Sequence, residues 1–387
     1  MPMFSRRLPP HADLNALTEA LARRTGRGPV VDLTESNPTR ARIAYPPDLL
    51  RGLSAPEALR YEPHAFGLPS AREVIARDHR RRGITIDPAH VVLTASTSEA
   101  YTWLFKLLCN PGESVLVPRP SYPLFEHLTR LEGVCSAPFD LEYHGRWEID
   151  PAALDAAPAS TRAVVIVSPN NPTGSYVSRR DIHQVSALCR DRGWALIVDE
   201  VFADYPLEVD APLTDIAARS DVLAFTLGGL SKSAGLPQLK LGWIVAGGPP
   251  AARDVALAGL ELIADSFLSV ATPVQLAAAD LLAHGASVRS AIQERIGANL
   301  ATLREGARSF TACEVLKTEG GWSAVIRVPT TRSEEQLVLD LLEREGILVH
   351  PGYFFDFQRE AFVVVSLLPE PHVFRDASTR LLRFASS

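Results

Sequence analysis

The sequence predicts an α/β protein whose larger part is a mostly parallel seven-stranded sheet sandwiched by helices, with a small α+β domain after it. Two observations predict this fold class. Short Val/Ile/Leu runs alternate with helical patterns through the middle of the chain, as in a parallel sheet covered on both faces. A long helical pattern then ends this alternation, and further strand and helix patterns follow it.

Seven short apolar runs are the candidate strands of the large sheet. Their length and their Val and Ile content favour strands over helices. They span residues 90–94, 114–118, 134–139, 163–168, 195–199, 222–226 and 241–246.

One crossover helix is predicted between the fourth and fifth of these strands. Ser178 is a suitable N-cap, Asp181 stands where it can accept from the first free amides, and Gly193 ends the pattern. From Thr272 to about Ser309, apolar residues at helical spacing predict a long connecting helix, with a break at Gly285.

The C-terminal patterns predict the small domain. Strands are expected at 322–328 and 362–368, with helices at 334–345 and from Pro371 to the end. The Pro-rich arm from Pro9 to Pro47 is expected to lie on the small domain or on a partner subunit. The predicted division is an arm with part of the small domain at 1–46, a large domain at 47–275 and a small C-terminal domain at 276–387.

Composition excludes several classes of function. The 387 residues include 39 Lys and Arg against 45 Asp and Glu, a net charge of −6 that gives no sign of a nucleic-acid partner. No run of about 18 apolar residues predicts a membrane span. The four cysteines have no metal-ligand spacing, so no metal site is expected. Reduced thiols and the absence of a signal-peptide pattern predict a cytoplasmic protein.

Polar groups follow several predicted strands, at the edge where open α/β sheets bind ligands. Lys232 lies in a Gly-Gly-Leu-Ser-Lys-Ser-Ala-Gly turn that would project its amine into the cleft, where a lowered pKa would let it form a Schiff base. Most lysines are surface groups, so this position alone is ambiguous. Asp199 ends the apolar run Ala-Leu-Ile-Val and needs a cation or strong donor, such as a protonated pyridine nitrogen. A helix cap or an ion pair would also explain that carboxylate.

Two turns add hydrogen-bonding groups. Pro172 and Gly174 fix a turn that could present the amide of Asn171 into the cleft, although turn formation alone explains the same residues. Ser96, Thr97 and Ser98 stand where a strand gives way to a helix, an arrangement that suits phosphate. A simple N-cap is the alternative there.

The order of these pieces resembles that of the class I/II aminotransferases, fold type I enzymes that use pyridoxal 5′-phosphate (PLP). Six motifs of that family occur here in sequence over nearly the whole chain: YEPHAFGLP, TASTSEA, RPSYP, NNPTG, DEVF and SKSAGLPQLKLGW.

The resemblance implies a role for each matching position. Lys232 would hold PLP as a Schiff base and move the proton, and Asp199 would keep the pyridine nitrogen protonated. Asn171 would donate to the ring oxygen and Tyr122 would stack on the ring. The phosphate would be held by Ser96, Thr97, Ser98, Ser231 and Lys240, with Tyr61 from the neighbouring subunit. The resemblance thus implies a homodimer with shared sites, acting on amino acids and 2-oxo acids.

Three positions depart from the family pattern. Phe202 replaces a Tyr that donates to the ring oxygen, which predicts a higher pKa for the Schiff base unless Tyr205 or another donor substitutes. Lys240 replaces an Arg and loses the bidentate fork. Val364 stands where an Arg usually binds the substrate carboxylate, with Arg359 and Arg375 as possible substitutes or as surface residues.

Asp265 falls near the place where dicarboxylate-specific relatives carry an Arg that reaches the other subunit's site, so a cationic or neutral substrate side chain is the hypothesis. An aminotransferase is the leading prediction. The alternatives are another PLP carbanion reaction, such as a carbon–sulfur β-lyase or an amino-acid decarboxylase, and a non-catalytic regulatory protein of the same fold.

Overall fold

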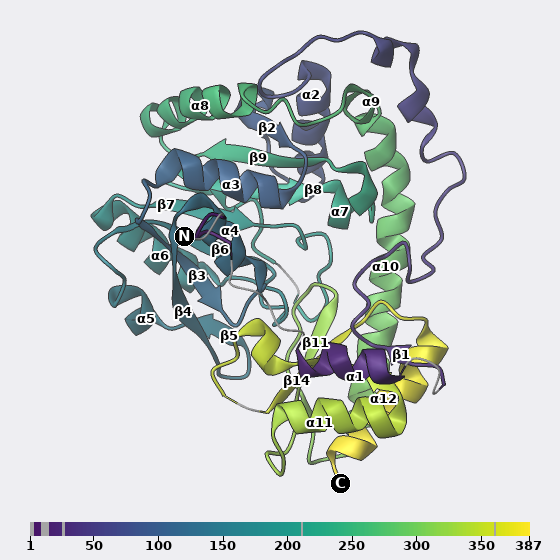
Figure 1. Ribbon diagram of the computed structural model, residues 1–387. Helices are drawn as coiled ribbons and strands as arrows, with labels where there is room; N and C mark the ends of the chain where they lie inside the picture. The colour runs from purple at the N-terminus through teal and green to yellow at the C-terminus, as the bar shows by residue number, and fades with distance from the viewer. Residues whose placement is uncertain (1–3, 9–14, 25–27, 210–211, 360) are drawn as a thin grey trace.

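The computed structural model describes residues 4–8, 15–24, 28–209, 212–359 and 361–387. Its centre is an eight-stranded sheet in the order β2-β9-β8-β7-β6-β3-β4-β5 (Figure 1). The strands are β2 (Val91–Thr94), β3 (Ser114–Arg119), β4 (Cys135–Tyr143), β5 (Trp147–Ile149), β6 (Thr161–Val167), β7 (Ala195–Asp199), β8 (Ala224–Gly229) and β9 (Gly242–Gly247).

All seven predicted strands are present, and the prediction of a mostly parallel sheet is confirmed. Only β9 and β5 run antiparallel to their neighbours in this sheet. The strand missed by the sequence pattern is β5, a three-residue hairpin partner of β4 that is too short for a periodic signal. Strands β2, β3, β6, β7 and β8 therefore all end at one edge of the sheet, where the polar segments begin.

Helices cover both faces of this sheet because successive strand residues point to opposite sides. Along β6, Val165 packs with α3, α4 and α8, whereas Val164 and Ile166 pack with α5 and α6. Helices α2 and α7 cover the end formed by β2 and β9. Their bounds are α2 (Pro69–His79), α3 (Thr97–Leu108), α4 (Leu124–Glu132), α5 (Pro151–Asp155), α6 (Arg179–Arg192), α7 (Leu230–Ser233) and α8 (Pro250–Asp265).

The crossover helix α6 has the predicted ends. The Ser178 side chain accepts from the Asp181 amide at 3.0 Å, and Gly193 closes the helix in the left-handed conformation with φ 67°. A serine cap and a terminal glycine are the two ends that helices favour.

The long connecting helix is divided at a different place from the predicted one. A short helix, α9 (Thr272–Leu276), precedes α10 (Ala278–Ala307), and α10 runs through Gly285 without a break. A Cβ at Gly285 would lie 2.5 Å from Ala234 Cβ, so this glycine lets α10 approach the turn that carries Lys232. In Figure 1, α10 extends from the level of α2 and α9 to α12.

The C-terminal part of the chain forms an antiparallel sheet of order β10-β11-β14-β13. Both predicted strands and both predicted helices are present, and the helix at 334–345 ends in a π-turn. The elements are β10 (Glu314–Val315), β11 (Ser323–Arg327), α11 (Glu334–Asp340), the π-turn η7 (Leu341–Glu345), β12 (Ile347–Leu348), β13 (His350–Pro351), β14 (Phe362–Ser366) and α12 (Pro371–Ala385).

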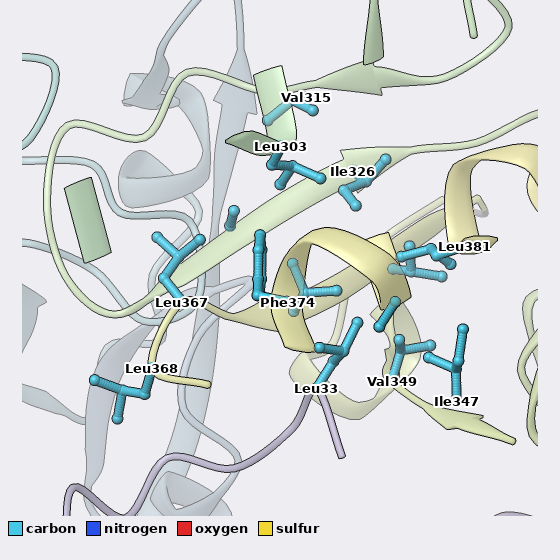
Figure 2. Packing of buried hydrophobic residues seen from close by; sticks show 14 of the residues in the cluster. Leu33, Leu303, Val315, Ile326, Ile347, Val349, Leu367, Leu368, Phe374 and Leu381 are labelled. Atoms are coloured by element: carbon cyan, nitrogen blue, oxygen red, sulfur yellow. The ribbon is translucent and has the colours of Figure 1, made fainter. Parts of the chain in front are cut away.

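The described part of the N-terminal arm packs on these C-terminal elements. Helix α1 (Ala16–Arg24) lies beside α11, and β1 (Val31–Asp32) pairs in parallel with β12 (Figure 1). Leu33 is fully buried and shares a hydrophobic cluster with Phe374 and Leu381 of α12 (Figure 2). This burial fixes residues 34–36 beside β14.

Candidate active site

Lys232 and Asp199 lie close together at the carboxyl edge of the large sheet. Asp199 is the last residue of β7, and Lys232 lies in the short helix α7 that follows the adjacent strand β8. Burial lowers the pKa of Lys232 to about 8, an effect that the charge of Asp199 opposes. Burial raises the pKa of Asp199 to about 6, and the charge of Lys232 opposes that shift. The strand ends thus place the amine of half-buried Lys232 near the buried carboxylate of Asp199.

The Asp199 carboxylate is held by two donors. The Val201 amide donates to Oδ1 at 3.0 Å, and the Tyr101 hydroxyl donates to Oδ2 at 3.0 Å. Tyr101 lies on α3, and the sequence analysis missed it because it precedes Asp199 by 98 residues. Its buried ring packs edge-on against Phe125, which fixes the hydroxyl towards the carboxylate.

The Lys232 amine faces two aromatic rings. Nζ lies 4.8 Å from the centre of the Trp322 ring and 5.2 Å from that of Phe202, and the two rings meet edge to face. Such contacts favour a positively charged nitrogen. Trp322 is a second residue that the sequence analysis missed.

Tyr205 does not replace the hydroxyl that Phe202 lacks. Its hydroxyl donates to the backbone oxygen of Lys232 at 2.5 Å, and its ring packs against Trp322. The proposed substitution by Tyr205 is therefore wrong, because this hydroxyl is already used to hold the lysine turn.

The turn before α3 brings Ser96, Thr97 and Ser98 to the same edge of the sheet. The Ser96 side chain accepts from the Glu99 amide at 3.2 Å, so it is an N-cap. Strand β9 begins against this turn: a Cβ on Gly242 would lie 3.0 Å from the Ser96 carbonyl carbon and 3.2 Å from the Thr97 nitrogen. The helix N-terminus with its free amides is suited to an anion.

Ser231 and Lys240 lie on two segments that meet at the start of β9. Ser231 directly precedes Lys232, and the Leu230 amide donates to the Leu241 carbonyl at 2.9 Å, which brings the segments carrying the two residues together. Lys240 is exposed and has a left-handed backbone with φ 52°.

Asn171 and Tyr122 line one pocket on the side facing the C-terminal sheet. Their loops are tied together by Asn170, whose amide donates to the Pro120 oxygen and accepts from the Ser121 hydroxyl, both at 3.0 Å. Asn170 is the third residue missed by the sequence analysis, which considered only its neighbour. The Asn171 side chain and the Tyr122 ring are thereby held at one opening.

The same pocket contains Val364. The strand register pairs Val364 of β14 with His350 of β13, and both residues line the pocket with Ser36 and Ser323. Arg359 and Arg375 are exposed and do not line it. The pocket therefore has no arginine among its described lining residues, and neither suggested substitute is positioned to serve.

Tyr61 and Asp265 lie elsewhere on the surface. Tyr61 is 75% exposed and lines a different pocket with Leu268 and Gln275. Asp265 is the exposed last residue of α8. Neither residue lines the pocket that contains Tyr122 and Asn171.

A buried ion network supports the strand end behind Asp199. Arg82 lies 3.3 Å from Glu200 and 3.0 Å from Asp215, and the Glu200 carboxylate accepts from the Asp215 and Ile216 amides. Burial raises the pKa of Glu200 to about 7, which the charge of Arg82 opposes. The network anchors the segment immediately after Asp199 to the 3-10 helix Arg80–Arg82 that follows α2.

Comparisons with known proteins agree with this geometry. A family model described as aminotransferase class I and II matches residues 52–370. The chain is 29% identical over 353 residues to the glutamate–pyruvate aminotransferase AlaA of Haemophilus influenzae, covering 88% of this chain and 85% of that protein. It is also 29% identical over 371 residues to an alanine aminotransferase of Mycobacterium bovis, covering 92% and 86%.

Solved structures show the same fold. An Escherichia coli aminotransferase superposes with a TM-score of 0.85 at 25% identity over 96% of this chain and 94% of that one. The alanine aminotransferase of Pyrococcus furiosus gives 0.85 at 21% identity over 95% and 94%. No helix in the described part of the chain is long and apolar enough to cross a membrane. The chain belongs to the class I and II aminotransferase family, as the order of its motifs predicts, and its activity is that of an aminotransferase.

Proposed function

We propose that this aminotransferase binds PLP covalently through Lys232 and moves an amino group between an amino acid and a 2-oxo acid. The observation that carries the proposal is the pair formed by half-buried Lys232 and buried Asp199 beside the ends of adjacent parallel strands. When bound, PLP would supply an aldehyde for the lysine and a pyridine ring that withdraws electrons from the substrate's α-carbon.

The chemistry of the donor set fits PLP. A lysine with a pKa near 8 is neutral in roughly a tenth to a fifth of molecules near pH 7, far more than an ordinary lysine, and attack on an aldehyde requires the neutral amine. Asp199 is oriented by Tyr101 and Val201, and it would balance a protonated pyridine nitrogen. The free amides at the start of α3, with Ser96, Thr97, Ser98, Ser231 and Lys240 around them, would receive the phosphate.

The remaining roles follow from the placement of the side chains. Asn171 would donate to the ring oxygen and Tyr122 would cover the ring, since both line the pocket beside the strand ends. Lys232 Nζ would accept and hold the proton from the substrate's α-carbon. Phe202 and Trp322 would exclude water from that nitrogen.

We propose a small neutral amino acid, such as alanine, as the amino donor. The relatives at 29% identity are named for alanine or for glutamate and pyruvate. Asp265, whose negative charge would disfavour an acidic side chain, argues against glutamate if the partner subunit presents it to the site. Tyr61, exposed in the single chain, would complete the phosphate site of a partner in a homodimer.

A cytoplasmic location is part of the same proposal. All four cysteines are free thiols, as in a reducing compartment.

The test is a half-reaction screen. The purified protein is loaded with PLP, single amino acids are added, and the absorbance change to the pyridoxamine form is recorded. Wild type is expected to convert at least one amino acid, and Lys232→Ala none. Lys106→Ala is the control: it removes a surface ion pair with Glu132 and should convert the same amino acids as wild type. If PLP binds and no amino acid converts it, transamination is excluded.

A second carbanion reaction alongside transamination is the other candidate, because Val364 at the pocket wall replaces the usual arginine. The same samples report it. Release of pyruvate and ammonia from a cysteine conjugate without a 2-oxo acid would identify a carbon–sulfur β-lyase, and release of CO2 would identify a decarboxylase.

A further inference from the structure

The imidazole of His350 lies beside Val364, the position at which related enzymes usually carry an arginine for the substrate carboxylate. His350 and Val364 are directly opposed in the antiparallel pair β13–β14. Opposed residues of such a pair project to the same face of the sheet. Both line the pocket that contains Tyr122 and Asn171, so the imidazole borders the space that a longer side chain at position 364 would enter.

The ring of His350 has one nitrogen turned inward. Nδ1 is buried and has no hydrogen-bond partner among the described residues. The rings of Phe354 and Phe355 pack against the imidazole with centres 5.7 and 5.6 Å away. A proton on Nδ1 would be a buried, unsatisfied donor, so the neutral ring favours the tautomer that carries its proton on Nε2.

The other polar groups of this wall are weaker candidates for an anion. Thr34 donates its hydroxyl to Asp32 at 2.6 Å, and Ser366 donates to the Glu35 backbone oxygen at 2.6 Å. Ser36 and Ser323 add neutral hydroxyls to the wall. Among the lining residues in the described ranges, His350 alone has a side chain that can become cationic.

We propose that His350 recognises the substrate's carboxylate, in place of the arginine that Val364 has replaced. This proposal rests on the proposed function, since it concerns the amino-acid substrate of that reaction. The Nε2–H group donates to one carboxylate oxygen, and the hydroxyls of Ser36 and Ser323 lie on the same wall. A neutral or singly charged donor holds a carboxylate less tightly than a bidentate guanidinium, so a lower affinity for amino acids accompanies this arrangement.

The test compares donors that differ only in the acid group. Single-turnover conversion of PLP-loaded protein is measured with L-alanine and L-alaninol, and with L-leucine and L-leucinol. The variants are His350→Phe, which keeps the ring, and His350→Gln, whose amide can replace the Nε2 donor. His90→Asn is the matched control, because His90 lies on the 3-10 helix Pro88–His90 and not in this pocket.

Wild type and His90→Asn are expected to prefer each amino acid over its alcohol. His350→Phe should lower conversion of the amino acids roughly 10- to 100-fold, the worth of a hydrogen bond to a charged group, and that of the alcohols less than about threefold. The loss should raise KM and leave kcat nearly unchanged, and His350→Gln should restore part of it. Propionate binding, followed through the cofactor's absorbance, should weaken by the same factor in His350→Phe.

Equal losses for acids and alcohols in a folded His350→Phe would overturn the proposal and assign the ring a packing role. A wild type that prefers the alcohols would also overturn it, because its substrate then has no carboxylate beside the amine. If His350→Phe does not fold, His350→Asn takes its place, because the shorter amide does not reach the position of Nε2. Unchanged acid preference in His350→Asn decides against the proposal. If wild type, like the Lys232→Ala control, converts no donor at all, the proposed function is wrong, and this inference is wrong with it.

Discussion

Asp199 is buried, and burial disfavours the charged form of its carboxylate. Its pKa is raised from 3.8 to about 6, chiefly by burial, although Val201 and Tyr101 donate to it. The folded chain therefore binds this proton more tightly than the unfolded chain does, and stability is lost as pH rises from about 4 to 6. A protonated pyridine nitrogen would remove that cost.

This cost predicts the effect of Asp199→Asn on the protein without PLP. The substitution should raise the free energy of unfolding by up to about 3 kcal/mol at pH 8 and by little at pH 4. PLP-dependent activity should fall by more than about 100-fold, because the pyridine nitrogen loses its counter-ion. Urea unfolding at the two pH values measures the first effect, and equal stability changes at both would contradict it.

The lowered pKa of Lys232 predicts how fast PLP attaches. Only the neutral amine attacks the aldehyde, so the rate should rise about tenfold per pH unit below 8 and level off above it. Stopped-flow absorbance after mixing protein with PLP at pH 6 to 10 gives the profile. A rate that keeps rising to pH 10 would mean that the amine keeps its ordinary pKa.

The ring of Phe202 predicts a high pKa for the nitrogen that joins Lys232 to PLP. Two effects act in one direction there: the missing hydroxyl removes a donor, and the Phe202 and Trp322 rings stabilise a positive nitrogen. Phe202→Tyr should lower this pKa by roughly one unit in an absorbance titration. Phe202→Leu, which removes one ring without adding a hydroxyl, separates the two effects.

At the scale of elements, the turn that carries Asn171 depends on its contact with the loop before β11. A Cβ on Gly174 would lie 2.7 Å from the Gly320 oxygen, and φ at Gly174 is 71°. Gly145, in the β4–β5 hairpin, has φ 84° and nothing within 4 Å of its Cβ. Both glycines have a positive φ that would strain any other residue, but only Gly174 also has the close contact.

The pair of substitutions separates these causes. Gly145→Ala should cost about 1 kcal/mol of stability and leave activity intact. Gly174→Ala should cost more and lower kcat/KM about tenfold, because the turn must shift and move Asn171. Thermal unfolding and half-reaction rates of both variants are the measurements. Equal losses in the two variants would show that the contact with Gly320 does not position the turn.

The helices and strands also show which parts of the fold can be predicted from the sequence pattern. Seven strands and the ends of α6 were predictable, because Val and Ile runs, Ser178 and Gly193 are local signals. Gly285 was misinterpreted as a break, since its reason is a close approach to Ala234, which lies far away in the sequence. Strand β5 and the two-residue strands β1, β10, β12 and β13 are too short for a periodic signal.

At the scale of the whole molecule, the site residues also divide into those with a local sequence signal and those that depend on contacts between distant elements. Lys232, Asp199 and Asn171 stand in motifs whose order survives in the sequence. Tyr101 and Trp322 act through contacts between distant elements, and such contacts have no local signature. The pocket likewise combines distant parts of the chain, since Ser36, Asn171 and His350 all line it.

The homodimer is the largest-scale proposal, and Tyr61 provides its test. If Tyr61 completes the partner's site, Lys232→Ala and Tyr61→Ala are defects in different halves of one shared site. Each variant alone should be nearly inactive or strongly impaired. After mixed refolding, half of the dimers pair the two variants, and each such dimer has one site with both residues intact. Activity should therefore recover to about a quarter of the wild-type value.

Recovery distinguishes a shared site from a self-contained one. If Tyr61 served its own chain's site, every site in the mixed dimers would still lack one residue, and activity would stay at the average of the two variants. Tyr143→Ala with Lys232→Ala is the control pair, because Tyr143 packs against Trp147 in the β4–β5 hairpin and is not assigned to the phosphate site. Sedimentation of the mixed sample confirms that dimers have formed. Without dimers, the partner role of Tyr61 and the shared site would both be wrong.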